Sequence, residues 1–320
     1  MNAGVLLSLL LAAAPAELPK AAWRGYEYLQ HEVDVAGHPM RYVESGAGDP
    51  ILLLHGIPTH GYLWRNVVDG LDRHGRVIVP DLMGYGASYQ GDELSYDGQS
   101  QQRYFDAFMD ALDLQDVTLV VNDLGSVLGL HWASRHPDRV KRIILVEAAM
   151  LDGPSWYRHL PLKMKMMFSL MRNPRRAEKY LVDKNMMVET MIPKLGVKRR
   201  LTEDEMHAYR EPFATEDVRA RVLTPLGPAA MPKKGRSQDA WDAAGMMDTY
   251  ADWLRTTNIP KLLLWARPGL IASPSAVRQA KRTFTNLKSV KLPGRGVHFL
   301  AEDHPDAIAA EVARFIDETP

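Results

Sequence analysis

One carboxylate lies where a buried strand is predicted to turn sharply into a helix. Residues 117–121 have the pattern of a buried strand, and residues 124–135 have the pattern of a helix, with Asp123 between them and Gly125 two positions later. This is the pattern of a nucleophile elbow, which usually presents serine in a G-x-S-x-G motif. The chain contains no such motif. Asp123 is therefore predicted to be the nucleophile, kept ionised by the start of the helix; the alternative is that it only caps this helix.

A carboxylate nucleophile implies particular chemistry. It suits attack on an sp³ carbon that carries a leaving group, which gives an alkyl ester on the enzyme, and this ester must then be hydrolysed by an activated water. Hydrolysis needs an oxyanion hole. The loop His55-Gly56-Ile57-Pro58 follows the apolar run 51–54 and precedes a predicted helix. In nucleophile-elbow enzymes such a loop supplies one oxyanion N–H, and the residue after the nucleophile supplies the other. The backbone amides of Ile57 and Leu124 are the predicted donors.

A base and an acid can be assigned by chain order. His298 follows the last predicted strand, 290–292, and precedes the last helix, so it is the candidate base among eleven histidines. Glu147 comes directly after the predicted buried strand 142–146, whereas residues 266–269, after the next strand, contain no carboxylate. Glu147 is therefore predicted to orient His298. The alternative is a glutamate that only anchors the segment after it.

The elements that carry these residues predict an α/β protein. Strands without polar alternation, separated by helices, are typical of a parallel sheet with both faces covered. The alternation stops near residue 150 and resumes near 240. Residues 155–215 favour several helices and no strand, and residues 216–237 are irregular. A helical insertion into one sheet explains this better than two consecutive domains. The predicted strands are 41–44, 51–54, 76–80, 117–121, 142–146, 261–265 and 290–292.

Seven segments resemble the haloalkane dehalogenases, specifically those with an Asp–His–Glu triad. They are HGIPTHGYLWRNV (55–67), DLMGYGAS (81–88), VVNDLGSVLGLHWASRHPDRV (120–140), ILVEAAM (144–150), LTEDEMHAYREPF (201–213), IPKLLLWARPGL (259–270) and GRGVHFLAEDHPDAI (294–308). The resemblance implies an α/β-hydrolase fold, with a mostly parallel sheet covered by helices on both faces and a helical cap inserted after the sixth strand. It implies Asp123 as nucleophile, His298 as base and Glu147 as acid. The expected boundaries are 17–150 and 238–320 for the core and 151–237 for the cap.

Two departures from the family concern the leaving group. The family usually has Asn in H-G-N-P and Trp after the nucleophile, and their side-chain N–H groups hold the departing halide. This chain has Ile57 and Leu124 instead. Each lost donor costs on the order of 3 kcal/mol of barrier, about a hundredfold in rate. Carbon–halogen cleavage of a small apolar substrate, with water as co-substrate, is the leading interpretation. The candidate substrate contacts are Trp156, Tyr157, Phe168 and Tyr209.

Two other functions stay open at this point. An epoxide hydrolase needs a proton donor rather than a halide site, and related enzymes use two cap tyrosines; Tyr157, Tyr180 and Tyr209 are available. A ligand-binding relative without catalysis is the other alternative. It would be favoured if Asp123 and His298 were out of hydrogen-bond reach or if the pocket were closed.

The composition of the chain limits the other functions and locations that it could have. The chain has 320 residues, 39 Lys+Arg, 39 Asp+Glu and no Cys. The balanced charge speaks against nucleic-acid binding, and no metal or other cofactor is expected. Residues 1–16 are predicted to be a signal peptide, because a short apolar run is followed by Ala14-Pro15-Ala16. The run is too short for a stable membrane span. A periplasmic or secreted protein is expected; the alternative is a cytoplasmic protein with an N-terminal extension.

Overall fold

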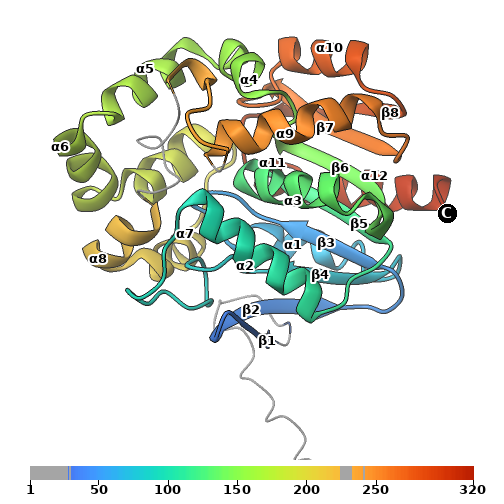
Figure 1. The fold of residues 1–320 in the computed structure, drawn as a ribbon, viewed down its shortest axis with the longest axis horizontal. Coiled ribbons are helices and arrows are strands. Elements are labelled where there is room, and N and C mark those ends of the chain that lie inside the picture. Colours follow the sequence, from blue (N-terminus) through green and yellow to red (C-terminus); the bar gives the residue numbers. More distant parts are fainter. Residues whose placement is uncertain (1–27, 29, 224–232, 241) are drawn as a thin grey trace, which may run out of the picture.

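The computed structural model describes residues 28, 30–223, 233–240 and 242–320. The predicted signal peptide, residues 1–16, lies outside them. Eight strands form one sheet in the order β1-β2-β4-β3-β5-β6-β7-β8 (Figure 1). The strands are β1 Gln30–Val35, β2 His38–Ser45, β3 Pro50–Leu54, β4 Arg76–Pro80, β5 Val117–Asn122, β6 Val140–Ala148, β7 Lys261–Pro268 and β8 Leu287–Gly296.

The sheet is parallel from β4 to β8, and β1 and β2 are added antiparallel at one edge. The central strands have no polar alternation because both of their faces are covered. Every residue of β5 is buried, as are all but one in β6. Parallel strands end at the same edge of a sheet, so the residues that follow β3, β5, β6 and β8 are brought to one edge.

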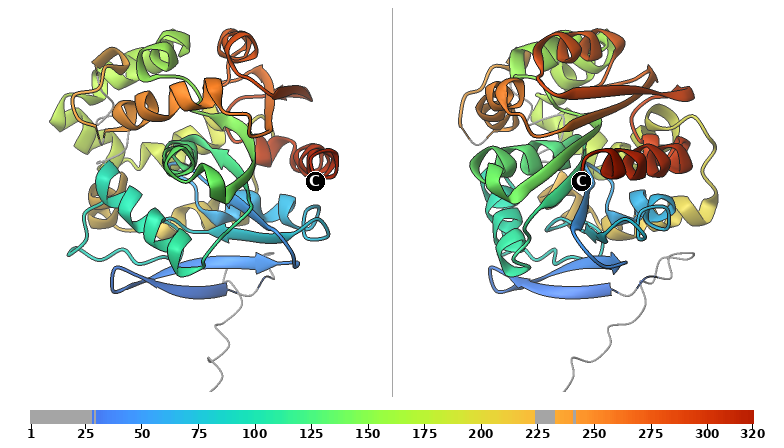
Figure 2. Two further views of the ribbon diagram at one scale, coloured as in Figure 1. Left: turned by 45° about the vertical axis from the view of Figure 1, so that its right-hand side comes forward. Right: turned by 90° about the vertical axis from the view of Figure 1, so that its right-hand side faces the viewer.

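Helices cover both faces of the sheet. On one face α1 (Arg65–Val68) packs against α12 (Pro305–Glu318). On the other face α3 (Asp123–Arg135) packs against α2 (Gly98–Ala111) and α9 (Ala243–Thr256). The right-hand view of Figure 2 shows α12 on the opposite side of the sheet from these three helices. Beyond them, α10 (Pro274–Thr283) packs against β7 and α11 (Leu300–Asp303) precedes α12.

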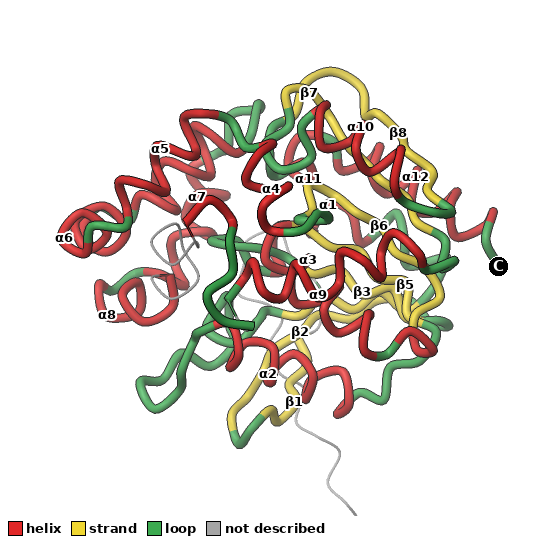
Figure 3. Tube along the Cα trace, turned by 45° about the horizontal axis from the view of Figure 1, so that its top comes forward, coloured by secondary structure: helices red, strands yellow, loops and turns green. Residues whose placement is uncertain are grey.

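The segment between β6 and β7 is helical, as the sequence predicted. It gathers beyond one end of the strands, where α5, α6 and α8 lie together (Figures 1 and 3). No strand occurs between residues 149 and 223 of the described chain. No helix among the described residues is long and apolar enough to cross a membrane. The elements are α4 Gly153–His159, α5 Leu162–Met171, α6 Pro174–Ala177, the π-helices Glu178–Asp183, Met187–Gly196 and Arg219–Leu223, α7 Glu203–Arg210 and α8 Glu216–Val218.

Short 3-10 helices complete the description. They are Gly61–Trp64, Pro137–Arg139, Glu211–Phe213 and Lys233–Gly235. The main difference from the predicted elements is β1, a strand that is additional to those predicted. Its sequence, QHEVDV, is mostly polar because the strand lies at the edge of the sheet and several of its side chains face solvent.

Candidate active site

Asp123 occupies a sharp turn between β5 and α3. Its φ of 45° lies in the left-handed region, which is strained for a residue with a side chain. Strain of this kind persists only where the surrounding structure enforces it, and it is common at functional sites. Gly125 allows the turn, because a Cβ atom there would lie 2.5 Å from the carbonyl oxygen of His55. The structure therefore contains the elbow that the sequence predicted.

The Asp123 carboxylate is held from two sides. Its Oδ1 accepts a hydrogen bond from the backbone N–H of Ile57 at 3.0 Å, and the N–H of Leu124 also donates to the carboxylate. Its Oδ2 lies 3.3 Å from Nε2 of His298. Burial alone would raise the pKa of Asp123, but the His298 imidazolium and the two N–H groups lower it below its ordinary value. Asp123 is therefore an anion at neutral pH, with 23 % of its side chain exposed toward the pocket.

His298 lies between two carboxylates. Its Nδ1 is 3.6 Å from Oε2 of Glu147. Burial lowers the pKa of His298, but Asp123 and Glu147 outweigh this effect and raise it to about 9. Glu147 is fully buried, and its Oε2 accepts hydrogen bonds from the backbone N–H groups of Leu270 at 3.0 Å and Ile271 at 2.7 Å. The loop after β7 thus carries no carboxylate of its own but fixes the one near the end of β6, a strand that extends one residue beyond Glu147.

The loop that carries His298 is fastened to the helical segment. The carbonyl oxygen of Gly196 accepts hydrogen bonds from the N–H groups of His298 at 2.9 Å and Phe299 at 3.0 Å. A side chain at position 196 would collide with the Phe299 ring, since a Cβ there would lie 2.4 Å from it. The position of the imidazole therefore depends on contacts from both the sheet and the helices above it.

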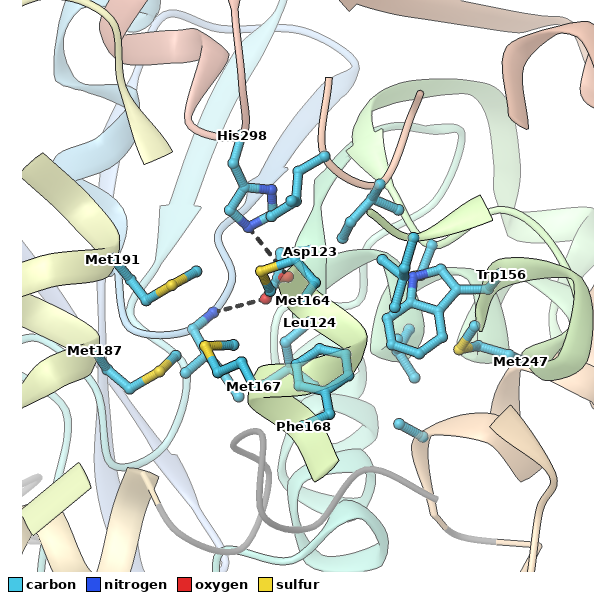
Figure 4. A pocket seen from close by; sticks show the side chains of 17 residues that line it. Asp123, Leu124, Trp156, Met164, Met167, Phe168, Met187, Met191, Met247 and His298 are labelled. Carbon is cyan, nitrogen blue, oxygen red and sulfur yellow. Dashed lines mark hydrogen bonds and ion pairs between the residues drawn. The ribbon is translucent and has the colours of Figure 1, made fainter. Parts of the chain in front are cut away.

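An apolar pocket opens above Asp123 (Figure 4). Its volume is about 80 Å³, well below the ~300–1,000 Å³ of pockets for drug-sized ligands, so it fits a small molecule. Among the described residues, no group of three or more His, Cys, Asp or Glu side chains is arranged to hold a metal ion. The lining residues are Ile57, Asp123, Leu124, Val127, Ala149, Trp156, Leu160, Met164, Met167, Phe168, Met187, Met191, Ala243, Met247, Leu270, Ile271 and His298.

Trp156 and Phe168, two predicted substrate contacts, line this pocket. Their rings stack with centroids 5.9 Å apart. The indole Nε1 of Trp156 is buried and has no hydrogen-bond partner within the described structure. Five of the lining side chains are methionines that were not among the predicted contacts. The Met-rich run 164–171, which supplies two of them, was the available signal in the sequence.

Tyr157 and Tyr209, the other two predicted contacts, do not line the pocket, and this corrects their assignment. The hydroxyl of Tyr209 instead donates to Glu302 in a buried network with Arg65. Tyr157 packs beneath the ammonium group of Lys165. Tyr180 is also absent from the pocket wall, and Lys184 lies over its ring. None of the tyrosines available for epoxide opening therefore reaches the pocket, which removes the support for that alternative.

The fold and site define the class of protein. Residues 49–305 match the family model described as the alpha/beta hydrolase fold. A haloalkane dehalogenase from Mesorhizobium japonicum is 38 % identical over 289 residues, which cover 90 % of this chain and 91 % of that protein. The chain therefore belongs to the haloalkane dehalogenase family.

Solved structures agree with this assignment. The haloalkane dehalogenase DatA from Agrobacterium tumefaciens is 33 % identical, with a TM-score of 0.81 and coverage of 91 % of this chain and 97 % of that chain. The haloalkane dehalogenase DbeA from Bradyrhizobium elkani is 34 % identical, with a TM-score of 0.83 and coverage of 91 % and 98 %. The predicted α/β-hydrolase fold and the predicted family are both confirmed.

Proposed function

We propose that this member of the family hydrolyses small apolar haloalkanes through an ester on Asp123. The observation that carries the proposal is the setting of that carboxylate: an anion at the floor of an apolar pocket, with two backbone N–H groups on one side and an imidazole 3.3 Å away on the other. A ligand-binding protein has no need for this arrangement. The 3.3 Å distance between Asp123 and His298 and the pocket above them both argue against a ligand-binding protein without catalysis.

In the first step Asp123 attacks the carbon that carries the halogen. The oxygen Oδ2 forms the new C–O bond while the carbon–halogen bond breaks, and the halide leaves with the bonding electron pair. Oδ1 stays on the N–H group of Ile57 and becomes the ester carbonyl oxygen, and the N–H of Leu124, which also donates to the carboxylate, lies beside it. The apolar wall excludes water, so the carboxylate is poorly solvated and remains reactive.

In the second step His298 activates water. Nε2 takes a proton from the water as its oxygen attacks the ester carbonyl carbon, and the resulting oxyanion is held by the N–H groups of Ile57 and Leu124. Collapse of this intermediate breaks the bond to the alkoxide, which takes the proton from Nε2 and leaves as an alcohol. Asp123 is left as a carboxylic acid and passes its proton to Nε2, which restores the carboxylate and the protonated imidazole of the resting enzyme. Glu147, whose Oε2 is 3.6 Å from Nδ1, stabilises the imidazolium that exists between the proton transfer from water and the one to the alkoxide. The net reaction consumes haloalkane and water and releases alcohol, halide and a proton.

Ester formation itself prepares the base. In the resting enzyme the pKa of His298 is about 9, so the imidazole is protonated at pH 7 and cannot accept a proton. Esterification removes the negative charge of Asp123, which is a principal cause of the raised pKa. The pKa of His298 then falls, the imidazole loses its proton, and the base becomes available only when there is an ester to hydrolyse.

The leaving halide needs a donor, because Ile57 and Leu124 offer no side-chain N–H. Trp156 supplies the candidate: its buried indole N–H faces no partner, and its ring is part of the pocket wall. A Trp156→Phe variant keeps the stacking on Phe168 and loses the N–H. We expect it to slow alkylation by 1-chlorobutane about a hundredfold, with a smaller effect on 1-bromobutane, since bromide is the better leaving group. Equal rates in the variant and the wild type would exclude Trp156 as the donor.

The central test is intact mass of a His298→Ala variant. Without its base, the variant should form the ester with 1-bromobutane and fail to release it. The protein then gains a butyl group in place of one proton, and peptide mapping places it on Asp123. An epoxide such as 1,2-epoxybutane would add its entire mass instead. The matched control is the double variant with Asp123→Asn, which should stay unmodified. If neither 1-bromobutane nor 1-chlorobutane gave an adduct, the proposed nucleophilic step would be refuted.

We also propose that the chain is exported and cleaved after Ala16. The support is the apolar run at residues 5–14 and the small residues before the cleavage point. Expression of the full chain followed by N-terminal sequencing of the periplasmic protein should give a first residue of Glu17. An intact N-terminus on protein found in the cytoplasm would contradict this proposal.

A further inference from the structure

Helix α5 has apolar residues on two opposite faces. Its inner face contributes Met164 and Phe168 to the pocket. Its outer face carries Leu162, Met166 and Leu170, with exposed fractions of 71 %, 56 % and 45 %. These three residues, here called the outer stripe, are spaced four apart and so lie on one side of the helix. They account for all but one of the large apolar side chains that the described structure exposes; the other is Leu195.

The chain around this stripe is basic. Whereas the whole protein has equal numbers of acidic and basic residues, residues 153–177 contain no Asp or Glu. The exposed cations at both ends of α5 include Arg158, Lys163, Arg175 and Arg176. The full set of lysines and arginines in this range is Arg158, Lys163, Lys165, Arg172, Arg175 and Arg176.

We propose that the outer stripe docks on the surface of an anionic lipid bilayer. Exposed apolar side chains flanked by Lys and Arg are the pattern of elements that lie in the interface plane, with the apolar groups at the boundary between headgroups and acyl chains. Each nearby cation is attracted by the negative surface potential of the bilayer. The two signals act together, because three apolar side chains alone hold a protein only weakly on a membrane.

The charge pattern also disfavours a second copy of this chain as the binding partner of the outer stripe. A symmetric contact between two outer stripes would bring the same basic segments together, and the repulsion between them would oppose association. An anionic bilayer satisfies both the apolar stripe and the surrounding cations. Binding there would also place the pocket one helix thickness from the bilayer, because the inner face of α5 lines it. Small apolar substrates concentrate in bilayers, so docking would bring the enzyme to its substrate.

The test is co-sedimentation of the full chain with vesicles. One vesicle is pure phosphatidylcholine and the other contains about 30 % phosphatidylglycerol, an anionic lipid. The test variant combines Leu162→Ser, Met166→Ser and Leu170→Ser, and the matched control is Leu195→Ser, which removes the exposed apolar side chain outside the stripe. Residues 1–16 are the same in every protein, so lipid binding through them does not distinguish the variants.

The wild type should bind the anionic vesicles at least about tenfold more strongly than the neutral ones, and salt should weaken this binding because the Debye length falls from about 10 Å at 0.1 M to about 3 Å at 1 M. The triple variant should lose about tenfold in partitioning, whereas Leu195→Ser should change it less than about twofold. Equal binding by the triple variant and the wild type would overturn the proposal. So would a wild-type dimer in solution that the triple variant abolishes, since a second copy would then be the occupant.

Haloalkane turnover in detergent-free buffer separates this proposal from the proposed function. The outer stripe contributes nothing to the pocket wall, so the triple variant should hydrolyse a dissolved haloalkane at the wild-type rate. Its rate should fall relative to the wild type only when the substrate is supplied in anionic vesicles. A failure of the ester test on His298→Ala leaves these binding measurements unaffected.

Discussion

Replacing Asp123 with asparagine should lower the pKa of His298. The substitution keeps the size of the side chain and an oxygen for the N–H of Ile57, but it removes the charge 3.3 Å from Nε2. At this separation two unit charges interact by about 1 kcal/mol at a dielectric constant of 80 and about 5 kcal/mol at 20. One pKa unit corresponds to about 1.4 kcal/mol. The pKa of His298 should therefore fall from about 9 by about 1 to 4 units.

The measurement is an NMR titration of protein labelled with ¹³C at histidine Cε1. A His298→Gln variant identifies the signal by its loss among the eleven histidines. Asp306→Asn, which removes an exposed carboxylate from the same part of the chain, should leave the titration unchanged. The Asp123→Asn protein imitates the uncharged ester, so its imidazole should be mostly neutral in mildly alkaline buffer. A pKa that stays at about 9 in Asp123→Asn would refute the mechanism by which ester formation releases the base.

Three further outcomes follow from other contacts. The stability that His298 gains from its carboxylates should be present in full below pH 6.5 and lost as pH rises through about 9, because its folded-state pKa is raised; urea unfolding of wild type and His298→Gln at both ends of this range should show the difference. Glu302→Ala should lower the free energy of unfolding by about 3–5 kcal/mol, since it removes the fully buried carboxylate shared by Arg65, Arg199 and Tyr209 and leaves the buried Arg65 with only the partly exposed Glu205, whereas Glu203→Ala, at an 84 % exposed side chain, should cost less than about 0.5 kcal/mol in the same denaturation assay. Ile57→Asn should restore a side-chain donor near the leaving group and raise chloride release from 1-chlorobutane about tenfold to a hundredfold; an unchanged rate would show that halide departure does not limit this enzyme.

The residues at the ends of the central strands were predictable because they are fixed by local pattern and chain order. The mostly apolar segments before Asp123, Glu147 and the His55 loop mark buried parallel strands, and parallel strands bring their ends to one edge. Gly125 marks the turn. These features determine which groups meet, although their distances and the raised pKa of His298 depend on contacts that only the folded chain makes.

The residues of the pocket wall were less predictable. The spacing of apolar residues identifies the faces of a helix, but it does not show which element each face packs against. Tyr209 was a reasonable candidate contact, but it bonds to Glu302, which is distant in sequence. The unpaired indole N–H of Trp156 could not be predicted from the sequence either, because it depends on which groups surround the ring after packing. The strand β1 was missed for a different reason: an edge strand with exposed side chains lacks the apolar run by which buried strands are identified.

The carbonyl of Gly196 restricts how the enzyme exchanges material with its surroundings. Because this one oxygen accepts from both His298 and Phe299, lifting the helical segment at that end would withdraw the base together with its loop. If the segment lifted during turnover, the ester on Asp123 would have no base beside it to activate water and could not be hydrolysed until the segment returned. In the proposed mechanism, substrate entry and product release therefore have to occur without loss of the two hydrogen bonds at Gly196 for as long as the ester is present.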